Sequence, residues 1–540
     1  MSTDVPQKAE PLEVDAARLP DDPALLKALV VQLVGALGER DARIAQLERH
    51  MDLLVRKMFG RTSEKCDANQ LALFDKAVGD KQPEEVIDVS ITAPAARSTV
   101  VKQPRRRPKP DTLERRDVVH DLTLAEKQLL AGDGTLVPIG EEVTEQYEWE
   151  PSCLYVLRHV QKKYARRPQL AESGEGAKNV ITATKPPQPI PGSRAGPGLL
   201  AWLITSRFCD HLPYHRQERI FARHGLRFSR QTTCDWARQL AELCQPIYEL
   251  LIAEVLASAV VHSDDTPVRV RDAHAKRQYT GRFWNYTGDD EHPFTVFAYT
   301  ADRSRDGPGE FLKNYRGYLQ ADAYSGYDQL YAQSGGVIVE VGCWAHARRN
   351  FFDARKIDPL RAETALAYIG QLYTVERQLR ERFEREGRQL PRAERAAVVA
   401  AERQQRSRPV LEQFRAWLDA EAPRLLPKEP VRQAIEYVRN QWTALNRYCD
   451  DGRLAIDNNA SERALRGIAV GRRNWLFCGS DRGGRTAAVH FSLIASALRH
   501  GLDPFAYLRD IFTRLPRLLA AGASRNQLRT LLPDCWTATG

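Results

Sequence analysis

Three acidic residues follow segments whose patterns predict secondary structure, and together they could bind metal ions. Asp264 follows a strand-like run in "ASAVVHSDDTPVRVR", Asp322 ends the strand-like "GYLQAD", and Glu462 lies in "IDNNASERALRG", which predicts the start of a helix. Phosphodiester cleavage uses two hard cations about 3.5 to 4 Å apart, and Mg²⁺ takes carboxylate oxygens as ligands. Because strand ends and a helix can bring distant acids together, these residues form a candidate two-metal site.

The spacing alone also fits ordinary structural roles for these acids. One of Asp264 and Asp265 could be a plain cap, and Asp322 could be a turn residue. Glu462 and Arg466 lie one helical turn apart, so they could form an ordinary surface ion pair. On the metal hypothesis the same two side chains face the site, where the acid holds cations and the arginine holds phosphate.

Basic side chains near the acids are candidates for contacts with phosphate. Asn458 or Asn459 is expected to cap the helix that carries Glu462. A second helix, "CWAHARRNFFDA", follows a predicted strand, and its polar residues could contact phosphate or serve only in packing. The candidates are His346, Arg348 and Arg349 in that helix, Arg463 and Arg466 beside Glu462, and Arg472, Arg473 and Arg485 in a Gly/Arg-rich loop.

The elements that must position the acids predict a multidomain α/β chain. Three consecutive strands, a helix and another strand, with acids at the ends of the first and fourth strands, follow the order of a ribonuclease-H-like core. We assign its first part to residues 251–355 and its second part, with the Glu462 helix, to residues 451–515. Residues 356–450 are rich in charged side chains and predict an all-helical insertion. Pro391 and Pro409 are expected to break its helices.

Two segments before the core could bind DNA. Residues 191–250 predict short helices, and the turn at Gly225 before "SRQTTCDWARQL" fits a helix-turn-helix, although ordinary helical packing would account for the pattern too. The second helix would present Arg230, Gln231, Thr232 and Thr233. Residues 61–112 form a basic, Pro-rich linker that could lie along phosphates through Arg105, Arg106 and Arg107.

The remaining segments complete the expected organisation. Residues 1–22 are predicted to be a disordered tail, and residues 516–540 a C-terminal tail. Residues 23–60 carry a heptad pattern that predicts a coiled-coil helix and a homodimer or higher oligomer. Residues 113–190 contain short strand-like runs and predict a small β-rich module.

Composition favours a nucleic-acid partner. The 540 residues carry 79 Lys and Arg against 70 Asp and Glu, a formal charge of +9. A basic chain suits a polyanion. The nine cysteines are scattered without a C-x-x-C pair, as expected for reduced thiols in a cytoplasmic protein. No signal peptide and no membrane-spanning segment is expected.

Several long motifs resemble the transposases of the insertion sequence 66 family of bacterial mobile elements. They are "RKMFGRTSEK", "LPYHRQERIFARHGLRFSRQTTCDWA", "HSDDTPV", "LQADAYSGYD", "CWAHARRNFFDA" and "DNNASERALRGIAVGRRNWLFCGSDRGG", in this order between about residues 23 and 515. The resemblance implies a DDE-type active site at Asp264, Asp322 and Glu462, with Mg²⁺, or Mn²⁺ in its place, as cofactor. It also implies binding of terminal inverted repeats, strand transfer into target DNA, two small accessory proteins and association with the bacterial nucleoid.

One departure from that family concerns zinc. Its members commonly carry paired cysteines of a small zinc-binding module, but "LLAGDGTLVPIGEE" and "KYARRPQLAES" contain no cysteine. Structural zinc typically takes four N or S ligands, so the 113–190 module is expected to fold without zinc. A competing class remains, namely a non-catalytic repressor or end-binding factor that uses only the coiled coil and the helix-turn-helix.

Overall fold

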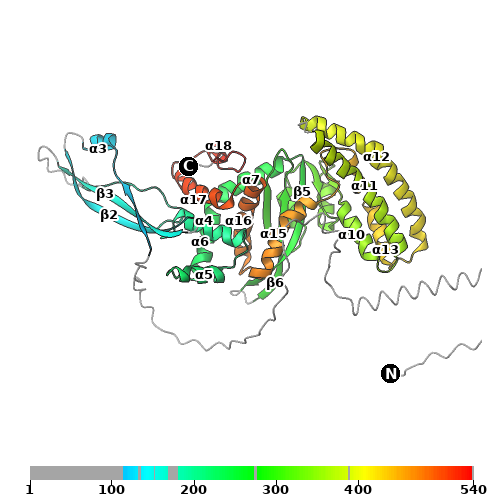
Figure 1. Ribbon diagram of the computed structural model, residues 1–540, viewed down its shortest axis with the longest axis horizontal. Coiled ribbons are helices and arrows are strands. Elements are labelled where there is room, and N and C mark those ends of the chain that lie inside the picture. Colours follow the sequence, from blue (N-terminus) through cyan, green and yellow to red (C-terminus); the bar gives the residue numbers. More distant parts are fainter. Residues whose placement is uncertain are drawn as a thin grey trace, which may run out of the picture.

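The computed structural model describes residues 113–131, 135–150, 153–167, 180–272, 277–386 and 390–537. The predicted tail at 1–22, the coiled coil at 23–60 and nearly all of the basic linker at 61–112 lie outside these ranges. Figure 1 shows a long β-hairpin at one end, a central sheet with helices against it, and a helical bundle at the other end. Within the described ranges, no helix combines the length and hydropathy needed to cross a bilayer.

The central sheet has five strands in the order β7-β6-β5-β8-β9. They are β5 (Val260–Asp272), β6 (Arg277–Thr287), β7 (Thr295–Thr300), β8 (Gly317–Gln320) and β9 (Ile338–Val341). The first three strands along the chain pair antiparallel, whereas β8 and β9 run parallel to β5. A helix, α8 (Asp306–Leu312), connects β7 to β8, so the predicted order of three strands, a helix and a strand is present.

Helices from distant parts of the chain cover this sheet. α15 (Asn459–Trp475) packs on β5 and β6, and α16 (Asp481–Arg499) packs on β7. β7 is an edge strand, and its outward N–H groups would otherwise lack partners. Two of them donate to serine hydroxyls of α16, from Phe297 N to Ser492 Oγ at 2.8 Å and from Thr295 N to Ser496 Oγ at 3.1 Å. The two hydroxyls therefore close this edge of the sheet.

The predicted insertion at 356–450 is helical in the structure. Its helices are α11 (Pro359–Glu386), α12 (Arg392–Glu421), α13 (Pro430–Asn440) and α14 (Trp442–Asn446). They share a core with α10 (Trp344–Ala354), in which Phe351, Ile369, Phe414 and Ile435 are fully buried. The break predicted at Pro409 is wrong, since that residue lies inside α12, whereas Pro391 does precede α12 at its N-cap. Packing of Phe414 and its neighbours offsets the cost of a proline in the helix.

The β-rich module differs from the predicted set of short strands. β2 (Thr135–Glu150) and β3 (Cys153–Arg167) form one long antiparallel hairpin. Both β1 (Arg115–His120) and β4 (Val180–Thr182) pair with β3, and α3 (Leu124–Ala131) follows β1. Where the facing residues of β2 and β3 are polar, cross-strand ion pairs stabilise the strand pairing, such as Lys163 with Glu142 at 3.0 Å. The pattern of apolar residues alone could not predict the full length of this hairpin, because many of its facing residue pairs are polar.

A buried acid anchors the hairpin to the helical region. The Glu148 carboxylate accepts a hydrogen bond from Leu199 N at 2.8 Å in the first turn of α4 (Pro197–Phe208), and burial raises the pKa of Glu148 to about 7. Gly196 and Gly198 permit this approach, since a Cβ atom at either position would lie 2.3 or 2.2 Å from a Glu148 oxygen. The hairpin is therefore fixed to α4 through a contact that needs glycine on the helix side.

The C-terminal residues are packed rather than a tail. α17 (Pro504–Ala520) lies on α4 and is followed by α18 (Arg525–Arg529). Tyr507 donates to Leu531 O at 3.0 Å, and the Trp536 indole donates to Asp510 at 2.8 Å. Leu531 and Leu532 are fully buried. The prediction of a tail at 516–540 is therefore wrong up to the last described residue, 537, because these apolar side chains complete the core under α17.

Candidate active site

One of the predicted acids lies in β5, and a second lies just beyond the end of the neighbouring strand β8. The registered pairing of β5 with β8 ends at His262 and Gln320, and Asp264 and Asp322 each lie two residues further on. Both acids therefore lie just past the end of the β5–β8 pairing, Asp264 within β5 and Asp322 in the segment after β8. Asp264 lies inside β5, not at its end as predicted, because β5 continues to Asp272 with β6 as its only partner strand.

The start of α15 is tied to β5 by Asn458. This residue is fully buried at the N-cap position, but its side chain does not cap the helix. Instead its amide donates to Ser263 O at 2.7 Å, and its Oδ1 lies 3.1 Å from His262 Nδ1. Asn459 does not cap the helix either, since its amide donates to Asp457 at 2.7 Å. The predicted capping role is therefore wrong, and Asn458 instead joins the helix to the strand.

A second contact fixes the first turn of the helix that carries Glu462. Ser461 is buried, and its hydroxyl donates to Asn285 Oδ1 in β6. Asn285 is the residue of β6 that pairs with Asp264. Glu462 follows Ser461 directly. This hydrogen bond therefore holds the backbone of Glu462 beside the strand pair β5 and β6, which carries Asp264.

The helical insertion positions the segment that leads into α15. Arg403 of α12 is buried, forms a two-point ion pair with Glu376 at 2.8 Å, and donates to Leu454 O at 2.9 Å. From the other side, Gln320 at the end of β8 donates to Ala455 O at 2.7 Å. The insertion and β8 therefore hold two adjacent residues, Leu454 and Ala455, of the segment that leads into α15.

The three acids share one electrostatic environment. Burial, together with the charges of Asp322 and Glu462, raises the pKa of Asp264 to about 7. Burial also raises the pKa of Asp322, while His346 and Arg303 act in the opposite direction. A like charge raises the pKa of a carboxyl group more strongly the closer it lies. The charges of Asp322 and Glu462 both act on Asp264, and the binding of one cation by all three acids stays a prediction.

The neighbouring aspartate has a different role. The Asp265 side chain is 2% exposed and binds Arg282 and Arg303, each at 2.8 Å, whereas Asp264 forms no ion pair with any described residue. Arg303 also lies 3.8 Å from Asp322 Oδ2. Sequence reasoning did not identify these two arginines, because neither lies in a motif and only the sheet brings them to Asp265.

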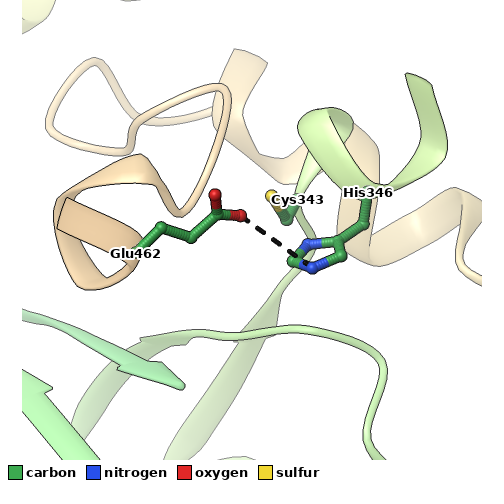
Figure 2. Close-up of side chains that lie close together, drawn as sticks. All are labelled: Cys343, His346 and Glu462. Carbon is green, nitrogen blue, oxygen red and sulfur yellow. Dashed lines mark ion pairs between the residues drawn. The ribbon is translucent and has the colours of Figure 1, made fainter. Parts of the chain in front are cut away.

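Glu462 faces His346 and Cys343 rather than Arg466. The Glu462 carboxylate lies 3.9 Å from His346 Nε2, and both side chains are partly exposed, at 30% and 25%. One ligand atom from each of Cys343, His346 and Glu462 lies within 4.8 Å of the others. Figure 2 shows the three side chains close together. Arg466 is exposed and forms no ion pair with Glu462, so the predicted surface pair is absent.

The predicted phosphate-binding residues occupy two helices near the acids and a third beyond them. Arg348 is half-buried and Arg349 exposed on α10, and Arg463 and Arg466 are exposed on α15. The predicted Gly/Arg-rich loop is largely helical: Arg472 and Arg473 belong to the last turn of α15, and Arg485 to the first turns of α16. The Arg472 guanidinium donates to Pro267 O and is half-buried, so it is less available than expected.

The region predicted as a helix-turn-helix contains two helices joined by a short turn. They are α5 (Tyr214–Arg223) and α6 (Arg230–Leu243), with Gly225 at a φ of 78° between them. Ser229 caps α6 by accepting from Thr232 N at 3.1 Å. Arg230 and Gln231 are exposed and Thr232 is half-buried, but Thr233 is 1% exposed and donates to a backbone carbonyl. Thr233 is therefore a core residue, contrary to prediction.

Arg105, Arg106 and Arg107 lie outside the described residues, so the predicted phosphate contact of the linker stays a prediction. Of the cysteines that the structure describes, none forms a disulfide.

Comparison with known proteins identifies the family. The family model for "Transposase IS66 family" matches residues 192–486, "IS66 C-terminal element" matches residues 492–533, and "Transposase C of IS166 homeodomain" matches residues 46–118. Two relatives come from Sinorhizobium fredii (strain NBRC 101917 / NGR234). The uncharacterized protein y4hP is 31% identical over 522 residues, covering 91% of this chain and 89% of that protein. The uncharacterized protein y4jD is 31% identical over 488 residues, covering 88% and 90%. The chain belongs to the IS66 transposase family.

Proposed function

We propose that this chain is a DNA transposase that cleaves and joins DNA strands with divalent metal ions held by Asp264, Asp322 and Glu462. The observation that carries the proposal is the shared environment of the three acids, in which two of them raise the pKa of Asp264. Membership of the family makes the ends of a mobile element the substrate. Mg²⁺ is the proposed ion, with Mn²⁺ as a substitute.

The sheet topology supports a ribonuclease-H-like core. An order of β7-β6-β5-β8-β9, with the first three strands antiparallel and the last two parallel to β5, fits that architecture. In this arrangement the central strand β5 carries Asp264, its parallel neighbour leads to Asp322, and α15 brings Glu462. The helical insertion between β9 and α15 lengthens the chain without interrupting the sheet.

The residues present fit hard divalent cations. Asp264 has no ion-pair partner among the described residues, and Glu462 Oε1 is buried without a hydrogen-bond partner. Such carboxylates are stabilised by a bound cation. Two bound divalent ions would supply an activated oxygen nucleophile and stabilise the leaving oxygen. Arg348, Arg349 and Arg463 would hold the flanking phosphates.

DNA recognition is proposed to use segments before the core. The exposed Arg230 and Gln231 and the half-buried Thr232 at the start of α6 would enter a groove or contact phosphate. Residues 105–107 would lie along the DNA backbone. A homodimer or larger assembly through residues 23–60 would bring two element ends together, with two small accessory proteins of the same element as further partners.

The proposal is tested with DNA that carries the element's terminal inverted repeats. Starting protein with Mg²⁺ is expected to nick the ends and join them to target DNA, whereas Asp264→Asn, Asp322→Asn and Glu462→Gln are each expected to lose both reactions. Asp328→Asn, at an exposed aspartate of α9 (Asp328–Gln333), is the matched control and keeps activity. Fluorescence anisotropy on the same DNA checks that binding survives in every variant.

Two outcomes would contradict the proposal. Activity that persists in all three acid variants would remove the active-site assignment. Specific binding of the ends by the starting protein, with no cleavage under any divalent ion and with the accessory proteins present, would instead identify a non-catalytic repressor or end-binding factor.

A further inference from the structure

A second set of metal-ligating side chains lies beside the three acids. Cys343 immediately precedes α10, His346 lies in the first turn of that helix, and Glu462 lies in the first turn of α15. One ligand atom from each residue lies within 4.8 Å of the others, and Figure 2 shows the three side chains converging. Three different donor types, S, N and O, thus meet at the junction of two helices.

Two polar atoms of this cluster have no hydrogen-bond partner in the part of the chain that the structure describes. Glu462 Oε1 and His346 Nδ1 are both buried and have no hydrogen-bond partner. The 3.9 Å between Glu462 and His346 Nε2 is too long for a hydrogen bond. Leaving a buried polar group unpaired costs about 1–3 kcal/mol. A cation that bound the imidazole and the carboxylate together would recover part of that cost.

The sulfur is placed to act as a thiolate ligand once a metal ion is bound. Cys343 is 1% exposed, and its Sγ accepts a hydrogen bond from Asn458 N at 3.2 Å. It also occupies the N-cap position of α10, where the positive end of the helix dipole stabilises a negative charge. Burial nevertheless raises the pKa of the free Cys343 thiol to about 12, so the metal ion itself must displace the proton.

The donor set selects the metal. Zn²⁺ binds Cys, His and carboxylate together in tetrahedral geometry, whereas Mg²⁺ takes oxygen ligands. We propose that Cys343, His346 and Glu462 bind one divalent transition metal ion of the Zn²⁺ class. Solvent occupies its fourth position, and the thiol proton passes to solvent when the S–metal bond forms. The sequence led us to expect no zinc, because residues 113–190 lack cysteine ligands, and the proposed site departs from that expectation by using other residues.

The site has a consequence for the reaction that rests on the proposed function. Glu462 is also the proposed Mg²⁺ ligand, so an ion held by Cys343 and His346 draws the same carboxylate away from Asp264 and Asp322. Zn²⁺ is therefore expected to inhibit the Mg²⁺-dependent reaction. Metal binding itself needs neither DNA nor activity, so it can be tested separately.

Cobalt titration of the full-length, reduced, chelator-treated chain tests the site. Co²⁺ replaces Zn²⁺ and gives a thiolate-to-cobalt charge-transfer band when a cysteine is a ligand. The starting protein is expected to bind one Co²⁺ with this band, and Cys343→Ala is expected to lose it. Cys244→Ala removes an equally buried sulfur at the end of α6 and should keep the band.

A second variant guards against a folding defect in Cys343→Ala. Glu462→Gln changes a partly exposed side chain, and it should weaken Co²⁺ binding by at least the ~10-fold that loss of a supporting partner costs a metal site. A band that persists in Cys343→Ala, no band in the starting protein, or unchanged affinity in Glu462→Gln would each overturn the site. If the site binds but saturating Zn²⁺ leaves strand cleavage unchanged, the competition for Glu462 is wrong.

Discussion

Neutralising Asp264 is expected to stabilise the metal-free protein at high pH. Burial, together with the charges of Asp322 and Glu462, raises the pKa of Asp264 from 3.8 to about 7. The folded chain therefore holds the Asp264 proton more tightly than the unfolded chain does. The stability that this protonation supplies is complete below about pH 4 and is lost as the pH rises through about 7. Asp264→Asn removes this loss and keeps an oxygen to accept the Asp265 N–H bond of 2.7 Å.

The size of the effect follows from the pKa change. Each unit corresponds to about 1.36 kcal/mol, so a rise of about three units gives an upper limit of about 4 kcal/mol above pH 7. Asp264 is half-buried, so water screens part of this and we expect about 2 kcal/mol at pH 8. At pH 5 most of the folded chains still hold the proton, and the gain should fall below about 1 kcal/mol.

Chemical denaturation in EDTA at pH 5 and pH 8 measures this difference. Asp265→Asn is the matched control, because it neutralises the adjacent acid but leaves Arg282 and Arg303 without their shared partner. That variant should lose about 2 kcal/mol at both pH values, at the low end for a broken buried pair since both arginines are partly exposed. Loss of stability in Asp264→Asn at pH 8, or an equal gain at both pH values, would refute the shared environment of the three acids.

Three further predictions concern the elements around the site. Asn458→Ala should lose about 2–4 kcal/mol of unfolding free energy, because it leaves Ser263 O and His262 Nδ1 of β5 unpaired. A loss below about 0.5 kcal/mol, which is usual for a substitution at the surface, would contradict this. Arg403→Lys should fail to restore the stability lost in Arg403→Ala, since lysine cannot form the two-point pair with Glu376, and thermal melting compares the two. Gln231 is exposed, so Gln231→Ala should weaken binding to element ends, measured by fluorescence anisotropy, without changing the melting temperature. Thr233 is buried, so Thr233→Val should change the melting temperature and not the affinity for DNA. The reverse pattern would contradict the role of α6 as the recognition helix.

Local patterns in the sequence predicted the strands and the helix around the three acids. Alternation with a period of two predicted the strands around Asp264 and Asp322, and the helix start before Glu462 was visible in "DNNASERALRG". These signals are local because they depend on which side chains share a face of one strand or one helix. The order of three strands, a helix and a strand then limited how the acids could be arranged.

What the sequence could not provide depends on contacts between distant residues. Asn458 and Ser263 are 195 positions apart, so no spacing shows that the asparagine binds a strand instead of capping its own helix. Asp264 and Asp265 look alike in the sequence, and only the arginines that the sheet brings to Asp265 separate their roles. Thr233 is buried for the same reason, since neighbouring helices decide which face of α6 is covered.

The sequence by itself determined the types and order of the elements around the three acids, but not the long hairpin or the packed C-terminal helices. Tertiary structure alone decided which of these side chains meet, including Cys343 and His346 with Glu462. The physical reason is that periodicity fixes the direction of a side chain relative to its own strand or helix, whereas hydrogen bonds and burial depend on the other elements packed against it.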